Sequence, residues 1–203
     1  RCAIVTGVQT CALPILPNII SEMDRMGIRR SVLLAIDPPG SDHVSMSYLD
    51  STSGNDRLIT FCGVNPRSRR WEEHIDECLE AGAKGIKVHP YLQWLPPSDE
   101  KVLDMIDRWG KSGYPILFHT AHNGLEPGIL RRLSDIEHYR EALRRFPDYT
   151  FIFGHAGMGF FREAVEMAKE HGNTYLEIGG QPPEAIKEMI DSLGPDKLLY
   201  GSD

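Results

Sequence analysis

Short, continuously apolar segments alternate with amphipathic segments along most of this 203-residue chain. We expect the apolar segments to be strands, at residues 31–37, 57–66, 85–90, 115–118, 150–153, 174–178 and 197–200. Apolar residues at helical spacing predict helices around residues 19–26, 71–81, 100–111, 136–146, 161–170 and 183–193. Strands that are apolar along their whole length are typical of a parallel sheet covered by helices. The pattern therefore predicts an α/β fold, either a doubly wound sheet or a barrel.

Composition excludes several classes of partner. The formal net charge is −7, with 22 basic and 29 acidic residues and no basic stripe, so we expect no nucleic acid partner. No apolar segment reaches the length of about 20 residues that spans a membrane, so no membrane partner is expected. No G-x-G-x-x-G or Walker-type glycine motif follows a strand, which disfavours dinucleotide or nucleotide binding.

The first residues of the chain require separate treatment. Residues 5–15 match, codon by codon, the translation of a common sequencing-adapter oligonucleotide, and a short signal peptide is the alternative. We therefore expect residues 1–15 to be an artefact and residues 16–203 to form a single domain from a gene fragment. Residues 3–8 form β-structure readily and are expected to fill the position of a first strand. Only Cys62 and Cys78 then remain, which predicts a reducing, cytoplasmic location.

Three apolar segments end on a group that can bind a metal or carry a proton. Residues 115–119 end on His119, residues 150–155 on His155 and residues 197–203 on Asp203. The carboxyl ends of parallel strands meet at one edge of a sheet, where α/β enzymes place their active sites. The sequence therefore predicts a site at that edge.

These segments also carry a family resemblance. Residues 85–90, 117–120, 153–157 and 199–203 resemble, in this order, the motifs of strands four, five, six and eight of the amidohydrolase superfamily. Residues 23–34 resemble the first helix and second strand of its amidohydrolase-related branch. The resemblance implies an incomplete (β/α)8 TIM barrel. The family's first-strand His-x-His pair does not occur in this sequence, whose first histidine is His43, and we expect truncation before Leu16 to be the reason.

The resemblance also implies roles for individual residues. His119 and Asp203 would be metal ligands, with Asp203 handling the proton of a metal-bound water. His155 would act catalytically, either as a ligand of a second metal or by orienting substrate and water. The candidate substrate-binding residues are Lys87, His89 and His122. A divalent metal ion is the expected cofactor, zinc first because imidazole and carboxylate suit it, with manganese and iron open.

The implied activity is metal-dependent hydrolysis, in which a metal-activated water attacks a carbonyl-type bond of a small-molecule substrate. The alternatives are a non-oxidative decarboxylase of the same superfamily or, for this chain, an inactive fragment with too few ligands. The intact protein is a candidate homo-oligomer. Other residues receive structural interpretations: we expect Glu177 to be a buried carboxylate, Trp94 to pack under its loop, and His43, His74, His138 and His171 to lie at the surface.

Overall fold

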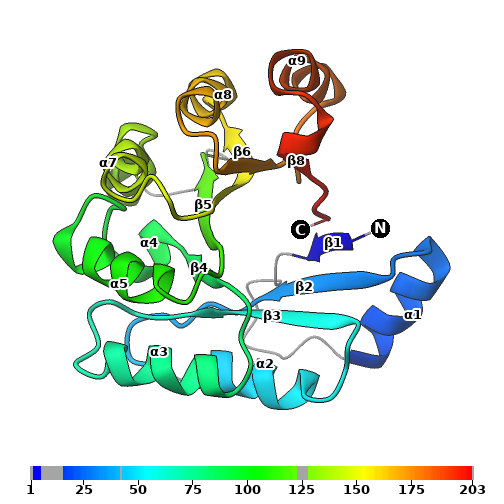
Figure 1. Cartoon of the computed structure of the whole chain (residues 1–203), viewed down its shortest axis with the longest axis vertical. Coiled ribbons are helices and arrows are strands. Elements are labelled where there is room, and N and C mark those ends of the chain that lie inside the picture. Colours follow the sequence, from blue (N-terminus) through cyan, green and yellow to red (C-terminus); the bar gives the residue numbers. More distant parts are fainter. Residues whose placement is uncertain (1, 6–15, 42, 123–127, 203) are drawn as a thin grey trace.

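A computed structural model describes residues 2–5, 16–41, 43–122 and 128–202. Its centre is an eight-stranded parallel sheet whose strands follow one another in sequence order. The strands are β1 (Cys2–Val5), β2 (Arg30–Leu34), β3 (Leu58–Gly63), β4 (Ile86–Val88), β5 (Ile116–Ala121), β6 (Phe151–Met158), β7 (Thr174–Glu177) and β8 (Leu198–Leu199). Figure 1 shows the sheet curling round, with most helices on its outer side.

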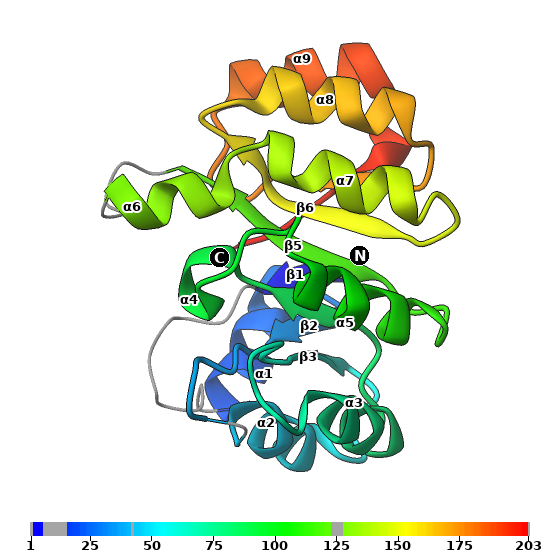
Figure 2. The same ribbon diagram turned by 90° about the vertical axis from the view of Figure 1, so that its left-hand side faces the viewer.

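The helices connect consecutive strands. They are α1 (Leu16–Met26), α2 (Val44–Thr52), α3 (Trp71–Glu80), α4 (Pro90–Gln93), α5 (Glu100–Gly110), α6 (Gly128–Arg131), α7 (Glu137–Arg145), α8 (Phe161–Glu170) and α9 (Pro183–Leu193), with 3-10 turns η1 (Arg132–Ser134) and η2 (Pro195–Lys197). Figure 2 shows α7, α8 and α9 gathered at one end of the molecule and α1, α2 and α3 at the other.

This arrangement is an incomplete (β/α)8 barrel, which confirms the fold that the family resemblance implies and excludes the doubly wound alternative. The sequential strand order leaves no reversal point of the kind found in doubly wound sheets. Residues 2–5 pair in parallel with β2, from Cys2 beside Arg30 to Val5 beside Leu33, which confirms that this segment takes the first-strand position. Within the described residues β8 pairs only with β7 and β1 only with β2, so the sheet is not closed between them.

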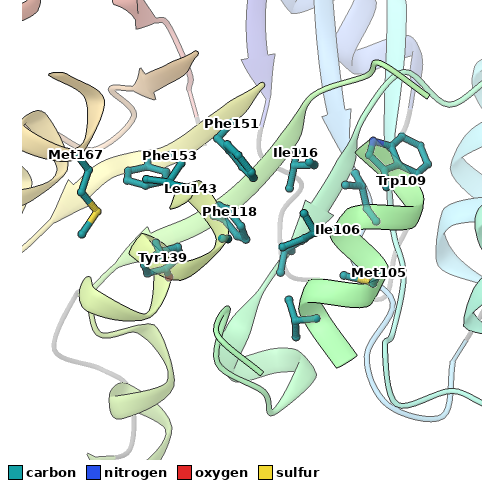
Figure 3. Packing of buried hydrophobic residues seen from close by; sticks show 14 of the residues in the cluster. Met105, Ile106, Trp109, Ile116, Phe118, Tyr139, Leu143, Phe151, Phe153 and Met167 are labelled. Atoms are coloured by element: carbon teal, nitrogen blue, oxygen red, sulfur yellow. The ribbon is translucent and has the colours of Figure 1, made fainter. Parts of the chain in front are cut away.

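The main core lies between the sheet and its outer helices. Trp109 of α5 and Tyr139 of α7 are fully buried in it (Figure 3). The ring of Tyr139 lies 5.2 Å from Phe118 of β5 and 5.5 Å from Phe153 of β6. The rings of Phe118 and Phe151 stack at 5.7 Å, and Phe153 lies 6.3 Å from Phe118. These large side chains point away from the barrel axis, which explains why the strands are apolar on their helix-facing side.

The alternate strand residues form a smaller cluster on the inner face. Leu117 and Ile152 belong to it and lie between neighbours that pack against the helices. Because successive side chains of a strand point to opposite faces, Lys87, His119 and Glu177 share the inner face with them. On this face the polar side chains of Lys87, His119 and Glu177 lie towards the carboxyl ends of the strands.

The longest helix that the sequence analysis does not predict is α2, and the four-residue helices α4 and α6 are not predicted either. Residues 44–52 form α2, although the segment is rich in serine and has no clear apolar stripe. Its start is capped from a distance: one oxygen of the buried Asp37 carboxylate accepts hydrogen bonds from the backbone N–H groups of Val44 (3.0 Å) and Ser45 (3.2 Å). A cap seven residues upstream leaves no local N-cap signature to detect.

The expectation of a surface position for His74 is wrong. This α3 side chain is buried, and its Nε2 lies 3.1 Å from the second oxygen of Asp37. The hydrogen bond to Asp37, followed by Cys78, raises the pKa of His74 from 6.5 to about 11. The same Nε2 faces both Asp37 and the Cys78 thiol, at 3.9 Å, so the three residues do not form a nucleophilic triad. They tie α3 to the end of β2.

The ion pair predicts a dependence of stability on pH. A raised pKa in the folded state stabilises the protein fully below pH 6.5, and this stabilisation is lost as the pH rises towards 11. The pKa of Cys78 is lowered to about 6, first by its hydrogen bond with Cys62, and acts in the opposite direction. We therefore expect the free energy of unfolding of Cys78→Ala to fall between pH 6.5 and 9, by up to about 1.4 kcal/mol per pH unit.

The matched variant for this test is Cys78→Ala combined with His74→Gln, in which the fall should be absent. Urea denaturation at a series of pH values measures both proteins. Equal pH slopes in the two variants would contradict the assignment of a charged His74.

No helix in the described part of the chain is long and apolar enough to cross a membrane.

Candidate active site

Four of the residues predicted to form the site meet inside the barrel at the carboxyl ends of β4, β5 and β6. Lys87 is the middle residue of β4, His89 follows that strand, His119 lies in β5 and His155 in β6. All four are buried, with exposed fractions between 1% and 6%. A lysine and three histidines in one buried space are unusual, because burial opposes their charged forms.

The imidazole rings are in direct contact. His89 and His119 stack at 4.1 Å with an angle of 11° between their planes, and His155 lies edge-on to His119 at 4.9 Å. Tyr91, in the short helix α4, completes the group: its hydroxyl oxygen is 3.0 Å from His119 Nε2 and its ring lies 4.4 Å from that of His89. His119 therefore touches three aromatic rings at once.

This environment keeps two of the histidines neutral. Burial, and then the charges of His89 and Lys87, hold the pKa of His119 well below 6.5. Burial, and then the charges of Lys87 and His155, lower the pKa of His89 in the same direction. Neutral imidazole presents a lone pair, which is the form that binds a metal ion or accepts a proton.

His155 is fixed by an unusual backbone. Its φ angle is 62°, and Ala156 and Gly157 follow with φ angles of 47° and 69°. Simple alternation from Ile152 would turn His155 towards the helices, and the left-handed turn breaks that alternation. Its Nδ1 lies 3.1 Å from the carbonyl oxygen of Gly179, which can only accept, so Nδ1 carries the proton. The Nε2 lone pair is then available to the site.

Lys87 of β4 extends its side chain close to Gly154 of β6. A Cβ added to Gly154 would come within 3.5 Å of Lys87 Nζ and 2.9 Å of the carbonyl oxygen of Phe118. A side chain at position 154 would therefore clash with the backbone of β5 and would reach ordinary contact distance from the lysine. The charge of Lys87 lowers the pKa of the neighbouring His89 and His119.

The remaining predicted residues are placed differently. His122 lies beyond β5, outside the stacked group: its ring packs against Phe160 at 4.7 Å, and Arg131 donates a weak 3.4 Å hydrogen bond to its Nδ1. Asp203 lies outside the described residues. Trp94 does not pack under its loop. It follows α4 with a left-handed backbone (φ 58°) and is 56% exposed.

Sequence reasoning misses Tyr91 as a site residue. It follows the His89–Pro90 pair and sits in a four-residue helix, and no periodicity distinguishes it from a surface tyrosine. Sequence reasoning also assigns Glu177 no role beyond burial. The burial is confirmed, because Glu177 is 0% exposed. Only the tertiary contacts reveal what these two residues touch.

The amidohydrolase family model matches residues 21–203, nearly the whole chain. The chain belongs to the amidohydrolase family. None of the curated proteins matches the sequence. The similarity to solved structures is high in fold and low in sequence, so those structures establish the barrel and not the reaction.

Three of these solved structures differ in the name that they carry and in their similarity to this chain. An uncharacterised TIM-barrel protein from Bordetella bronchiseptica is 18% identical with a TM-score of 0.79, covering 99% of this chain and 85% of that chain. A probable 2-pyrone-4,6-dicarboxylic acid hydrolase from Acinetobacter baumannii is 13% identical with a TM-score of 0.67, covering 99% and 83%. The 5-carboxyvanillate decarboxylase of Novosphingobium aromaticivorans, complexed with manganese and a nitrobenzoic acid, is 18% identical with a TM-score of 0.69, covering 92% and 69%.

Amidohydrolase-family proteins use divalent metal ions, and the donors in this chain fit part of such a site. His119 and His155 are buried, lie in contact and offer imidazole nitrogens, and burial favours the neutral form of His119. Within residues 2–5, 16–41, 43–122 and 128–202, no three His, Cys, Asp or Glu side chains are grouped closely enough to hold a metal. A metal ion held by these two histidines would therefore need further ligands.

Proposed function

We propose that this amidohydrolase-family protein is a metal-dependent, non-oxidative decarboxylase of a ring-containing carboxylic acid. The observation that carries the proposal is the buried Lys87 beside the stacked His89 and His119 at the carboxyl ends of the barrel strands. A buried cation next to neutral imidazoles is suited to an anionic small molecule. The fold-level likeness to 5-carboxyvanillate decarboxylase supports the same class of substrate.

The balance of charge assigns Lys87 to one part of the substrate. In decarboxylation the bond between ring carbon and carboxylate breaks, CO2 leaves without charge, and the ring carbon gains a proton. A cation held against the departing carboxylate would oppose this loss of charge. Lys87 therefore suits an anionic group that the product keeps, such as a phenolate or a second carboxylate.

The chain's other residues take complementary roles. A divalent metal, when bound by His119 and His155, supplies positive charge that stabilises negative charge developing on the substrate. Zinc and manganese are both candidates. His89 stacks behind His119 and fixes the ring plane. We propose Asp203 as the group that handles the proton, and His122 as a contact at the mouth. Two free buried thiols, Cys62 and Cys78, fit a cytoplasmic location.

Hydrolysis is the second candidate, and the likeness to a probable 2-pyrone-4,6-dicarboxylic acid hydrolase favours it. The same site could activate a metal-bound water against a ring ester, with Lys87 again holding a carboxylate. Both reactions thus use one binding arrangement and differ in what the metal activates.

The decisive experiment supplies the purified chain with Mn²⁺ or Zn²⁺ and offers it two substrate panels. One panel holds hydroxybenzoic acids labelled with ¹³C in the carboxyl group, and the other holds the corresponding lactones and esters. Labelled CO2 supports the decarboxylase, and acid release from esters alone supports the hydrolase. The control is His119→Ala, which should abolish either product. Absence of product together with absence of stoichiometric bound metal would contradict both activities for this chain and favour the inactive-fragment hypothesis.

A further inference from the structure

The carboxylate of Glu177 is the most completely enclosed charged group near the site. It lies at the end of β7 with no exposed surface. Its Oε2 accepts a hydrogen bond from the backbone N–H of His155 at 2.9 Å, and its Oε1 accepts one from the backbone N–H of Gly179 at 2.5 Å. Both oxygens are thus occupied by donors from two different segments. Glu177 plays no part in the reaction proposed above.

Two glycines make room for this carboxylate. A Cβ added to Gly179 would lie 2.5 Å from Glu177 Oε1, and one added to Gly201 would overlap the same oxygen. The end of β7, the loop after it and the chain beyond β8 therefore close around the carboxylate. A buried charge needs such complete satisfaction by donors.

The same segment holds His155 through all of its polar groups but one. Glu177 accepts from its backbone N–H, the Gly179 carbonyl accepts from Nδ1 at 3.1 Å, and Gln181 Nε2 donates to its carbonyl oxygen at 2.6 Å. His155 has a left-handed φ of 62°, which a histidine keeps only where its surroundings impose it. Nε2 is the remaining polar atom of a ring that lies edge-on to His119 at 4.9 Å.

We propose that Glu177 is a positioning residue that fixes the backbone and the Nδ1–H tautomer of His155, so that its Nε2 lone pair faces His119. The carboxylate acts on His155 directly through the backbone N–H and indirectly through Gly179, whose carbonyl it orients. The inference rests on the proposed function only in that His155 serves the site. It concerns the geometry of the chain and can be tested without catalysis.

The best variant is Glu177→Gln, which has nearly the same shape. Both oxygens of the carboxylate accept, and a glutamine amide has only one oxygen. Its NH2 group would therefore face a backbone N–H, either that of His155 or that of Gly179, and one of the two contacts must be lost. The matched control is Glu184→Gln, the same change at an exposed position in the first turn of α9.

The measurement is ¹⁵N NMR of the full chain labelled in its histidines, at neutral pH, with His155→Gln identifying the resonance. We expect wild type and Glu184→Gln to show His155 in the Nδ1–H tautomer, and folded Glu177→Gln to show a mixture or the Nε2–H tautomer. Glu177→Asp, which retains two acceptor oxygens, should restore part of the wild-type signal.

Two results would overturn the proposal. One is an Nε2–H tautomer in the wild-type protein, which can be seen even if Glu177→Gln does not fold. The other is an unchanged His155 tautomer in a folded Glu177→Gln protein. If the wild-type protein shows no decarboxylase activity but the NMR results are as expected, the proposed function alone is rejected. If the wild-type protein is active but the His155 tautomer is unchanged in Glu177→Gln, the positioning role alone is rejected.

Discussion

Replacing Trp109 with alanine lowers the free energy of unfolding by about 3–5 kcal/mol, the range for deleting a large buried aromatic side chain. Trp109 is fully buried in the same hydrophobic cluster as Ile106 and Ile116 (Figure 3). Truncation leaves a cavity that rigid strands cannot collapse to fill. A domain of ordinary stability retains little margin after such a loss, so we expect Trp109→Ala to be largely unfolded at 37 °C.

The matched control for this prediction is Trp109→Phe. The indole Nε1 is buried and has no hydrogen-bond partner in the described part of the chain, so its removal relieves an unsatisfied donor. The cavity left by phenylalanine is also smaller, and we expect a loss of less than about 2 kcal/mol. Urea denaturation followed by circular dichroism measures both variants. A loss below about 1 kcal/mol in Trp109→Ala would show that this cluster is not the main core.

If the proposed function holds, we expect the replacement of Lys87 with methionine to weaken the binding of a hydroxylated benzoic acid by at least about 30-fold, equivalent to about 2 kcal/mol. The side chain is 2% exposed, so its charge acts on a ligand through a medium of low polarity. Methionine has a similar length and no charge.

Lys84→Met is the control for this substitution. Lys84 precedes β4, whereas the stacked histidines lie at the carboxyl ends of the strands. It is exposed and donates to the hydroxyl of Tyr114 at 2.8 Å. Its replacement should leave ligand binding within about twofold of wild type. Isothermal titration calorimetry on both variants, with thermal unfolding in parallel, provides the test. Equal affinity in Lys87→Met and wild type would remove the anion-binding role from the lysine.

The fold could be predicted from the sequence because its signals are local. Apolar segments predict the seven strands after residue 15, and glycines such as Gly27 (φ 64°) and Gly194 (φ 82°) end helices where helical spacing stops. The sequence does not predict helix α2, because the cap of the helix comes from Asp37, outside the helix. It does not predict the burial of His74 for the same reason, since nothing in α3 itself indicates a carboxylate partner.

The candidate site divides in the same way. Alternation along β4 and β5 places Lys87, His89 and His119 on the inner face, because these strands are regular. His155 reaches the site against alternation, through a left-handed turn held by residues 177–181. Tyr91 depends on the direction of a four-residue helix. Positions on regular strands are thus predictable from pattern, and positions set by long-range hydrogen bonds are not.

The open seam between β8 and β1 has a consequence for where the molecule can loosen. Opening of a sheet starts at strands with one partner, and only β1 and β8 are in that position within the described residues. The histidines and Lys87 lie in or next to β4, β5 and β6, each bonded on both sides. The seam can therefore separate while Lys87, His89 and His119 keep their mutual distances, whereas loosening beyond β8 would uncover Glu177, which Gly201 encloses and which accepts from the backbone N–H of His155.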